Sequence, residues 1–350
     1  MLFTLWWVGA CAQPVARQEA YLWQRGWTDG VRAGVAAGRS VFSGIRVNAL
    51  SIGVEGTVLH AVDLTALVGS RVRIVVRIDS NQEIEAPGTA EILATTAARW
   101  RAAGVEVVGV EIDHDCPTRA LPAYAHAIRE IRRQLPADLL LSVTALPTWS
   151  SSDALDEVLG AADEVVLQVH AVDSPSEGLF HEDRANRAVS AYSARTERPL
   201  WVAVPAYGMK IGERELRVDP AAVTAFVAGL DSRVAGVVWF RLPTGDPRDW
   251  ALEAISGAIA GSPPTGRLEL RTVAGDGVFD LSVANVGVAW TALPARLTLS
   301  GDCSAADAVG GYRMDRSAGL AWVRDDLAPL DPGAVRAVGW ARCDSPPELR

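Results

Sequence analysis

The stretch Val108-Gly-Val-Glu-Ile-Asp-His-Asp-Cys-Pro117 joins a run typical of a buried β-strand to a row of carboxylates at its end. Side chains alternate along a strand, so Glu111, Asp113 and Asp115 share one face and follow one another at roughly 7 Å. The segment 120–135 that follows carries apolar residues at helical spacing. This stretch predicts a strand–helix unit with acidic side chains at the carboxyl end of the strand.

The same alternation of a β-branched run and a helix-like segment recurs along the chain. The expected strands are 20–25, 46–54, 72–78, 106–113, 139–145, 164–170, 200–205 and 235–241. Parallel strands need crossover helices, and such units close into a (β/α)8 barrel of about 250 residues. A doubly wound open sheet is the competing arrangement, but no glycine-rich fingerprint follows the first strand. The predicted fold class is α/β, with a TIM-type barrel.

The pattern changes after the turn-forming cluster Gly261-Ser-Pro-Pro-Thr-Gly266, which neither helix nor strand tolerates. Short alternating runs broken by Gly, Asn and Pro turns follow, and these favour a small all-β sandwich. The stretch 279–287, followed by Leu293-Pro294-Ala295, resembles the immunoglobulin-like accessory modules of exported bacterial proteins. The predicted organisation is a leader (1–19), a barrel (20–260), a linker (261–266) and an immunoglobulin-like sandwich (267–350).

The N-terminus is an apolar run that reaches Cys11 through Val8-Gly9-Ala10, and it resembles a bacterial lipoprotein signal. The resemblance implies export, a lipid anchor on Cys11, and a place in the periplasm or on the outer membrane. The apolar run is short and no Lys or Arg precedes it, which a start upstream of Met1 would explain. A buried first strand with a reduced cysteine is the alternative. No other stretch approaches the ~20 apolar residues of a membrane span.

Composition and cysteine usage limit which classes of partner and which metals the chain is expected to bind. The 33 basic residues are spread among 42 acidic ones, which argues against a nucleic-acid surface. Cys303 and Cys343 both lie in the C-terminal region, where a disulfide would suit an oxidising compartment. Cys116 stands alone inside the acidic motif, and no CxxC or Cys/His cluster predicts zinc. We expect neither a metal nor a cofactor.

The three acids would sit at the barrel mouth, where this fold keeps its active sites. Repulsion among them and partial burial should raise at least one pKa, as a general acid at neutral pH requires. The alternative is a solvated strand end or an incidental cation site.

The acidic stretch is similar to the fourth-strand signature of glycoside hydrolase family 18, the chitinase-like barrels: Asp-Gly-x-Asp-x-Asp-x-Glu-x-Pro. The matching positions are Gly109, Glu111, Asp113, Asp115 and Pro117. The resemblance implies that Asp115 protonates the glycosidic oxygen. Asp113 would orient the substrate acetamido group, which attacks the anomeric carbon.

The chain departs from that signature at three positions. Val108 stands in place of the first Asp, Asp115 in place of the Glu, and His170 aligns with a tyrosine of the sixth strand. The stretches 163–170, 199–208 and 236–241 resemble the sixth, seventh and eighth strands, so the resemblance covers most of residues 20–250.

A closer resemblance is to a family of uncharacterised bacterial exported proteins. Its members share Tyr-Leu-Trp-Gln-Arg, here residues 21–25, and Ile-Asp-x-Asp-Cys-Pro-Thr, here residues 112–118.

Further residues near strand ends are candidates for substrate binding: Trp23, Arg25, Glu55, Arg77, Asp79, Gln168, His170, Tyr207, Trp239 and Arg241. Each has a structural alternative. Arg77 could pair with Asp79 across a strand end, and His170 could be a satisfied hydrogen-bonding residue. Trp149, Trp201 and Trp239 could stack on sugar rings or fill the core.

Three functions compete. In the first, a glycosidase-like hydrolase acts on an extracellular or cell-envelope polysaccharide, with Asp115 as the proton donor and Asp113 or Glu111 supporting the developing charge. In the second, a degenerate barrel binds carbohydrate without turnover, anchored at the envelope. In the third, a metal-dependent hydrolase uses the acids with His170 or His114 as cation ligands. His114 should point away from the acids on a strand, which disfavours the third.

Overall fold

The computed structural model describes residues 17–350 apart from 172–176, 213, 318 and 327. Cys11, the predicted lipidation site, lies outside the described residues. The chain divides into two compact units, Met1–Ser262 and Pro263–Arg350.

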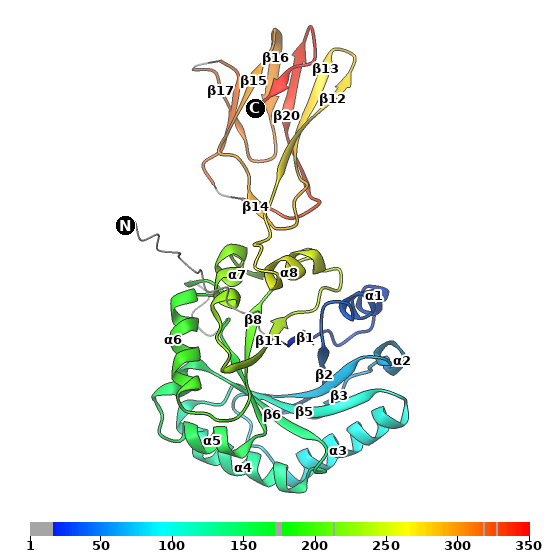
Figure 1. Ribbon diagram of the computed structural model, residues 1–350. Coiled ribbons are helices and arrows are strands. Elements are labelled where there is room, and N and C mark those ends of the chain that lie inside the picture. Colours follow the sequence, from blue (N-terminus) through cyan, green and yellow to red (C-terminus); the bar gives the residue numbers. More distant parts are fainter. Residues whose placement is uncertain (1–16, 172–176, 213, 318, 327) are drawn as a thin grey trace, which may run out of the picture. The chain divides into compact units, whose positions relative to one another are not determined.

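Parallel strands form a closed barrel in the first unit (Figure 1). They are β1 (Gln18–Leu22), β2 (Gly44–Gly53), β4 (Arg71–Ile78), β5 (Glu106–His114), β6 (Leu140–Ala145), β7 (Glu164–Gln168), β8 (Leu200–Pro205) and β11 (Val234–Phe240). The order around the barrel is β1-β11-β8-β7-β6-β5-β4-β2, and pairing of β1 with β2 closes the ring. The predicted TIM-type barrel is therefore confirmed, and the open sheet is excluded because no edge separates β1 from β2.

Helices cover the outside of the barrel (Figure 1). They are α1 (Asp29–Gly38), α2 (Leu64–Leu67), α3 (Ala86–Ala102), α4 (Leu121–Gln134), α5 (Leu155–Ala161), α6 (Glu182–Ser193), α7 (Pro220–Gly229) and α8 (Leu252–Ile259), with short 3-10 turns at Thr118–Ala120 and Pro147–Ser151. Side-chain caps start several of them: Thr28 accepts a hydrogen bond from the Val31 amide and Asp219 from the Ala221 amide. None of the described helices is long and apolar enough to cross a membrane.

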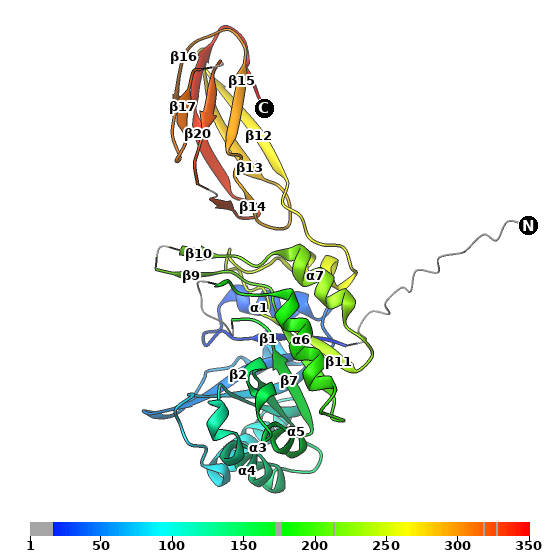
Figure 2. The same ribbon diagram turned by 90° about the vertical axis from the view of Figure 1, so that its left-hand side faces the viewer.

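Two hairpins interrupt the strand–helix repeat. β3 (Gly56–Leu59) returns antiparallel along β2, and β9 (Met209–Ile211) pairs with β10 (Arg214–Leu216) directly after β8. Figure 2 shows the β9–β10 hairpin extending beyond the barrel strands. The sequence repeat did not predict either hairpin, because each is an insertion after a strand that already has its crossover helix.

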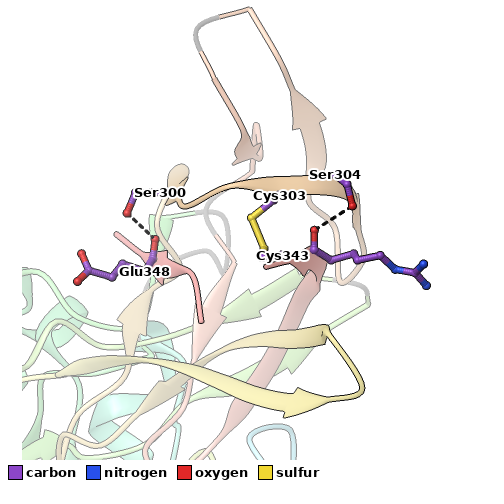
Figure 3. The surroundings of a disulfide bond; sticks show 6 residues. Ser300, Cys303, Ser304, Cys343 and Glu348 are labelled. Atoms are coloured by element: carbon purple, nitrogen blue, oxygen red, sulfur yellow. Dashed lines mark hydrogen bonds between the residues drawn. A yellow bond between two sulfur atoms is a disulfide. The ribbon is translucent and has the colours of Figure 1, made fainter. Parts of the chain in front are cut away.

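The second unit consists of antiparallel sheets. Its strands are β12 (Leu268–Gly275), β13 (Val278–Asn285), β14 (Thr291–Ala292), β15 (Arg296–Ser300), β16 (Cys303–Ala308), β17 (Arg313–Asp315), β18 (Ala321–Val323), β19 (Pro329–Leu330), β20 (Val335–Cys343) and β21 (Glu348–Leu349). One sheet has the order β12-β13-β20-β16 and another β17-β18-β15-β21. A disulfide between Cys303 and Cys343 joins β16 to the end of β20 (Figure 3). The unit has its own apolar core, which includes Leu281 and Trp322.

Candidate functional site

A pocket of about 530 Å³ lies at the carboxyl ends of the barrel strands. Residues from all eight strands or the segments just after them line it: Tyr21, Trp23, Arg25, Asn48, Arg77, Asp79, Asp113, Asp115, Thr144, Gln168, His170, Ala171, Tyr207, Met209 and Phe240. Nine of these residues were candidates from the sequence: Trp23, Arg25, Arg77, Asp79, Asp113, Asp115, Gln168, His170 and Tyr207. The pocket therefore brings together side chains spread over about 220 positions of the chain.

Arg77 links the two pocket carboxylates of β5. Its Nη1 donates to Asp113 Oδ2 at 2.8 Å, and its Nη2 donates to Asp115 Oδ2 at 2.5 Å. β4 and β5 pair in register with Arg77 opposite Asp113, so neighbouring strands place the three groups side by side. The alternative pairing of Arg77 with Asp79 is wrong, since Arg77 reaches across to the next strand instead.

The two carboxyl groups differ in environment. Asp113 is buried, whereas the Asp115 side chain keeps 33% of its surface exposed. Burial raises the pKa of Asp113 to about 6; Arg77 opposes this increase and the charge of Asp115 adds to it. One carboxyl of the pocket can thus hold a proton close to neutral pH, which is the property that acid catalysis needs.

Aromatic rings form one wall of the pocket around Phe240. Its ring lies 5.4 Å from Trp23, 5.8 Å from Tyr21, 5.2 Å from Tyr207 and 5.0 Å from His170, measured between centroids. Such a wall offers a flat apolar surface beside the carboxylates. Sugar rings, which have both apolar faces and hydroxyl edges, suit this combination.

His170 is a neutral residue of that wall. Burial lowers its pKa to about 3, so the imidazole carries no charge at neutral pH. Its Nδ1 is buried and has no hydrogen-bond partner among the described residues. The ring therefore offers an uncharged hydrogen-bonding group to a ligand.

Glu111 lies deeper than the other two acids and does not line the pocket, contrary to the expectation that it supports substrate charge. Its side chain is fully buried and accepts hydrogen bonds from Tyr21 Oη at 2.5 Å and Ser142 Oγ at 3.0 Å, and it pairs with Arg46. The acids share a face, as predicted, but each step along the strand moves a side chain toward solvent. Glu111 therefore faces the barrel interior, where a substrate does not reach it.

Glu111 belongs to a charged layer that fills the bottom of the barrel. Glu19 pairs with Arg46 at 2.8 Å and with Arg73 at 2.5 Å, and Arg73 pairs with Glu164 at 2.7 Å. Burial disfavours the charge of Glu19, yet Arg46 and Arg73 hold its pKa below the usual value. The layer is a set of compensated charges with a structural role.

Three further candidates lie outside the pocket. Glu55 is exposed in the turn between β2 and β3. Trp239 is fully buried and donates from Nε1 to Gln18 Oε1 at 2.8 Å. Arg241 follows β11 but turns away to Asp249 and Asp246, at 3.0 Å each. None of the three is positioned to bind a ligand in this pocket.

The other tryptophans proposed for stacking are also buried. Trp149 donates from Nε1 to the Cys116 carbonyl at 2.9 Å. Trp201 lies inside the barrel, with the guanidinium of Arg46 at 4.9 Å and that of Arg73 at 5.4 Å from its ring centroid. None of the three stacking candidates lines the pocket, whereas Trp23, predicted as a substrate-binding residue, does.

Asn48, Thr144, Tyr21, Met209 and Phe240 line the pocket without having been predicted as site residues. Asn48 had a usable signal, because it interrupts the apolar run 45–52 on the same face as Arg46. Met209 had no signal in the sequence, because it lies on the β9–β10 hairpin, which was not predicted.

The metal-dependent alternative receives no geometric support. Among the described residues, no three His, Cys, Asp or Glu side chains are grouped so as to hold a metal ion. His114 faces away from the acids, and its Nδ1 lies 3.3 Å from the Ile78 carbonyl.

Comparisons with solved structures find a similar fold in spore cortex-lytic enzymes and in a chitinase. The spore cortex-lytic enzyme SleL of Bacillus cereus has a TM-score of 0.54 at 11% identity, over 70% of this chain and 73% of that chain. SleL of Bacillus megaterium QM B1551 has a TM-score of 0.53 at 9% identity, over the same shares. A chitinase from Bacteroides thetaiotaomicron has a TM-score of 0.51 at 12% identity, over 71% of this chain and 95% of that chain. At these identities the likeness shows the fold alone.

The family itself is shown by sequence. The model described as "Domain of unknown function (DUF3142)" matches residues 69–245, which is just over half of the chain, and the protein belongs to this family. A second model, "Domain of unknown function (DUF8456)", matches residues 268–344. No curated protein matches the chain.

Proposed function

We propose that the protein is a glycoside-hydrolase-like enzyme that acts on an extracellular or cell-envelope polysaccharide by carboxylate acid catalysis. The observation that carries the proposal is the Asp113–Arg77–Asp115 group in the pocket at the barrel mouth. Acetal hydrolysis needs a carboxylic acid to protonate the leaving oxygen and a charged group to stabilise the oxocarbenium-like state. Of the two aspartates, Asp113 is buried with a raised pKa, while Asp115 is the more exposed and the more accessible to a substrate.

In this proposal Asp115 faces the glycosidic oxygen and Asp113 orients the substrate, as the resemblance to family 18 implies. Asp115 Oδ2 is held by Arg77, while its Oδ1 is buried without a partner among the described residues. That oxygen is free to accept a hydrogen bond from a sugar. Asp113, with its pKa of about 6, holds a proton in the weakly acidic range.

Unpartnered polar atoms support a polyhydroxyl ligand. Asn48 Oδ1, Asp115 Oδ1 and His170 Nδ1 are buried, and none has a hydrogen-bond partner within the part of the chain that the structure describes. All three residues line the pocket. Buried polar groups normally have partners, so three such atoms around one pocket support a bound molecule with hydroxyl groups.

A second candidate function is non-catalytic carbohydrate binding. The short ion pair between Arg77 and Asp115 favours it, because a proton donor must release such a partner before it can transfer a proton. Asp115 is also one methylene shorter than the Glu of the family 18 signature. A binding protein would keep the aromatic wall for contact with the sugar and would lack catalytic proton transfer by Asp115.

We also propose that the protein is exported and anchored through Cys11 as a lipoprotein of the periplasm or outer membrane. The Cys303–Cys343 disulfide supports an oxidising compartment. The domain organisation that goes with this proposal is a leader (1–19), a barrel (20–260), a linker (261–266) and an immunoglobulin-like module (267–350). The paired antiparallel sheets of the second unit suit such a module.

The test is hydrolysis and binding of a panel of N-acetylated and plain oligosaccharides by the purified chain. Asp115→Asn should abolish turnover and keep affinity, since it removes the proton but little volume. Asp29→Asn is the control, because the Asp29 side chain is fully exposed on α1. Binding without turnover in the unmodified protein would favour the non-catalytic function, and neither binding nor turnover would contradict both.

A further inference from the structure

Asn48 carries a buried amide oxygen, Oδ1, that has no hydrogen-bond partner among the described residues. The residue is 2% exposed, and it lines the pocket from β2. The fold does not require this arrangement, because the residue opposite it on β4 is Val75, which is apolar and fully buried.

Asn285 shows what a structural asparagine looks like in the same chain. It is fully buried, its Nδ2 donates at 2.8 Å to both the Ala289 and the Leu330 carbonyls, and its Oδ1 accepts from the Arg267 and Gly287 amides. Each polar atom of that side chain stabilises a turn or strand end. Within the described residues, Asn48 Oδ1 makes no such hydrogen bond.

The strand geometry presents Asn48 to the pocket. Arg46, two residues earlier, points into the barrel and pairs with Glu19 and Glu111 in the charged layer. Asn48 is on the same face one step closer to the mouth. The pairing of β2 with β4 shifts register between Asn48 and Leu50, so a bulge follows directly. Bulges beside ligand sites commonly re-aim a side chain.

A buried amide that makes no hydrogen bond lowers the stability of the folded chain. Replacing it by an apolar residue of similar shape would remove that penalty. A bound ligand offers the other solution, because a sugar hydroxyl both donates and accepts. Asp113 and Thr144 line the same pocket from β5 and β6, so such a hydroxyl would lie among polar groups on neighbouring strands.

We propose that Asn48 is a specificity-determining residue that binds a hydroxyl of the sugar ring seated at the bottom of the pocket. This inference rests on the proposed function, in either its catalytic or its binding form. A site built around a buried hydrogen-bonding group rejects an analogue that lacks the matching group far more strongly than an apolar site does. Asn48 therefore sets which ring, and which substitution of it, the pocket accepts.

The experiment combines stability with binding in Asn48→Leu, with Asn285→Leu as the matched control, both in the full chain. Thermal unfolding needs no ligand. Asn48→Leu should raise the Tm of the barrel transition by roughly 2–4 °C, and Asn285→Leu should lower the Tm of the second unit. A fall in the barrel Tm with Asn48→Leu would give Asn48 a folding role and overturn the inference.

Binding is measured by calorimetry with chitotetraose, cellotetraose and a peptidoglycan disaccharide. For whichever of these the unmodified chain binds, Asn48→Leu should weaken the affinity about 10- to 100-fold. Unchanged affinity would overturn the inference while leaving the proposed function standing. If the unmodified chain binds no sugar, the proposed function fails and the role assigned to Asn48 fails with it, whatever the Tm shows.

Discussion

Removing the Arg77 guanidinium tests the electrostatics of the pocket most directly. Arg77→Met keeps much of the aliphatic stem but leaves Asp113 and Asp115 side by side without their cation. An opposite charge within hydrogen-bond distance typically shifts a carboxyl pKa by about 1 to 3 pH units. Arg77 restrains the pKa of Asp113, which is already raised to about 6, so the variant should raise it further. The change corresponds to about 1.4 to 4 kcal/mol of lost stabilisation of the charged form.

The pKa of Asp113 can be followed by carbon-detected NMR of aspartate-labelled protein, with Asp113→Asn identifying the signal. Arg71→Met is the control, because Arg71 is on the same strand but pairs at the surface with Glu106. That control should leave the titration unchanged. Stability gives a second readout: the Asp113 carboxyl holds its proton more tightly when folded, so the destabilisation by Arg77→Met should grow as pH rises from 5 to 8. An Asp113 pKa that stays near 6 or falls in Arg77→Met would refute the reasoning.

Three further predictions concern stability. Glu111→Gln should lower the free energy of unfolding by about 3 to 5 kcal/mol because it breaks a fully buried ion pair, whereas Glu106→Gln at the surface should cost about 0 to 1 kcal/mol, both measured by denaturant unfolding. As pH rises from 4 to 7, the free energy of unfolding of Asp113→Asn should increase by about 3 kcal/mol relative to that of the unmodified chain. The folded Asp113 carboxyl has a pKa of about 6 against an ordinary value of 3.8, so the unmodified chain loses the stabilisation by this proton over that range. A pH-independent difference between the two proteins would contradict this. Replacing both Cys303 and Cys343 by Ala should destabilise the second unit by about 4 kcal/mol, because the bond closes a loop with a sequence separation of 40; equal unfolding midpoints with and without reductant would argue against it.

The barrel could be predicted from the sequence because its signal is repeated. Each strand is a short β-branched run buried on both sides, and each crossover needs an amphipathic helix, so the pattern recurs eight times at similar spacing. The hairpins β2–β3 and β9–β10 could not be predicted this way. They follow strands locally, add no crossover, and contain only a few residues each.

The row of acids on β5 was predictable as a shared face, but its depth was not. Period-2 alternation states which side of a strand a residue occupies and says nothing of how far along the barrel axis the pocket begins. Glu111 and Asp113 are one step apart on that face, yet one is sealed in the charged layer and the other lines the pocket. The prediction for Trp239 was wrong for a different reason. Adjacent residues of a strand point to opposite faces, so an error of one residue at a strand end turns a side chain from the pocket to the helices.

The charged layer can be recognised in the sequence. Glu19, Arg46, Arg73, Glu111 and Glu164 each interrupt an apolar strand run, and their signs are mixed. Single charges in the middle of strands that are buried on both faces have to find partners, because an isolated buried charge is far too costly. A search for compensating charges on different strands would have assigned Glu111 to this layer and left Asp113 and Asp115 for the pocket.

The unpartnered atoms around the pocket are the strongest argument that it has a ligand. Asn48 Oδ1, Asp115 Oδ1 and His170 Nδ1 are buried without a hydrogen-bond partner among the described residues, and all three residues line the pocket. The charged layer below also contains two such atoms, Arg46 Nη2 and Trp201 Nε1, but neither residue lines the pocket. The three pocket atoms, in contrast, adjoin a cavity of about 530 Å³. Their partners can therefore come from outside the chain, and the aromatic wall around Phe240 indicates that they arrive on a ring.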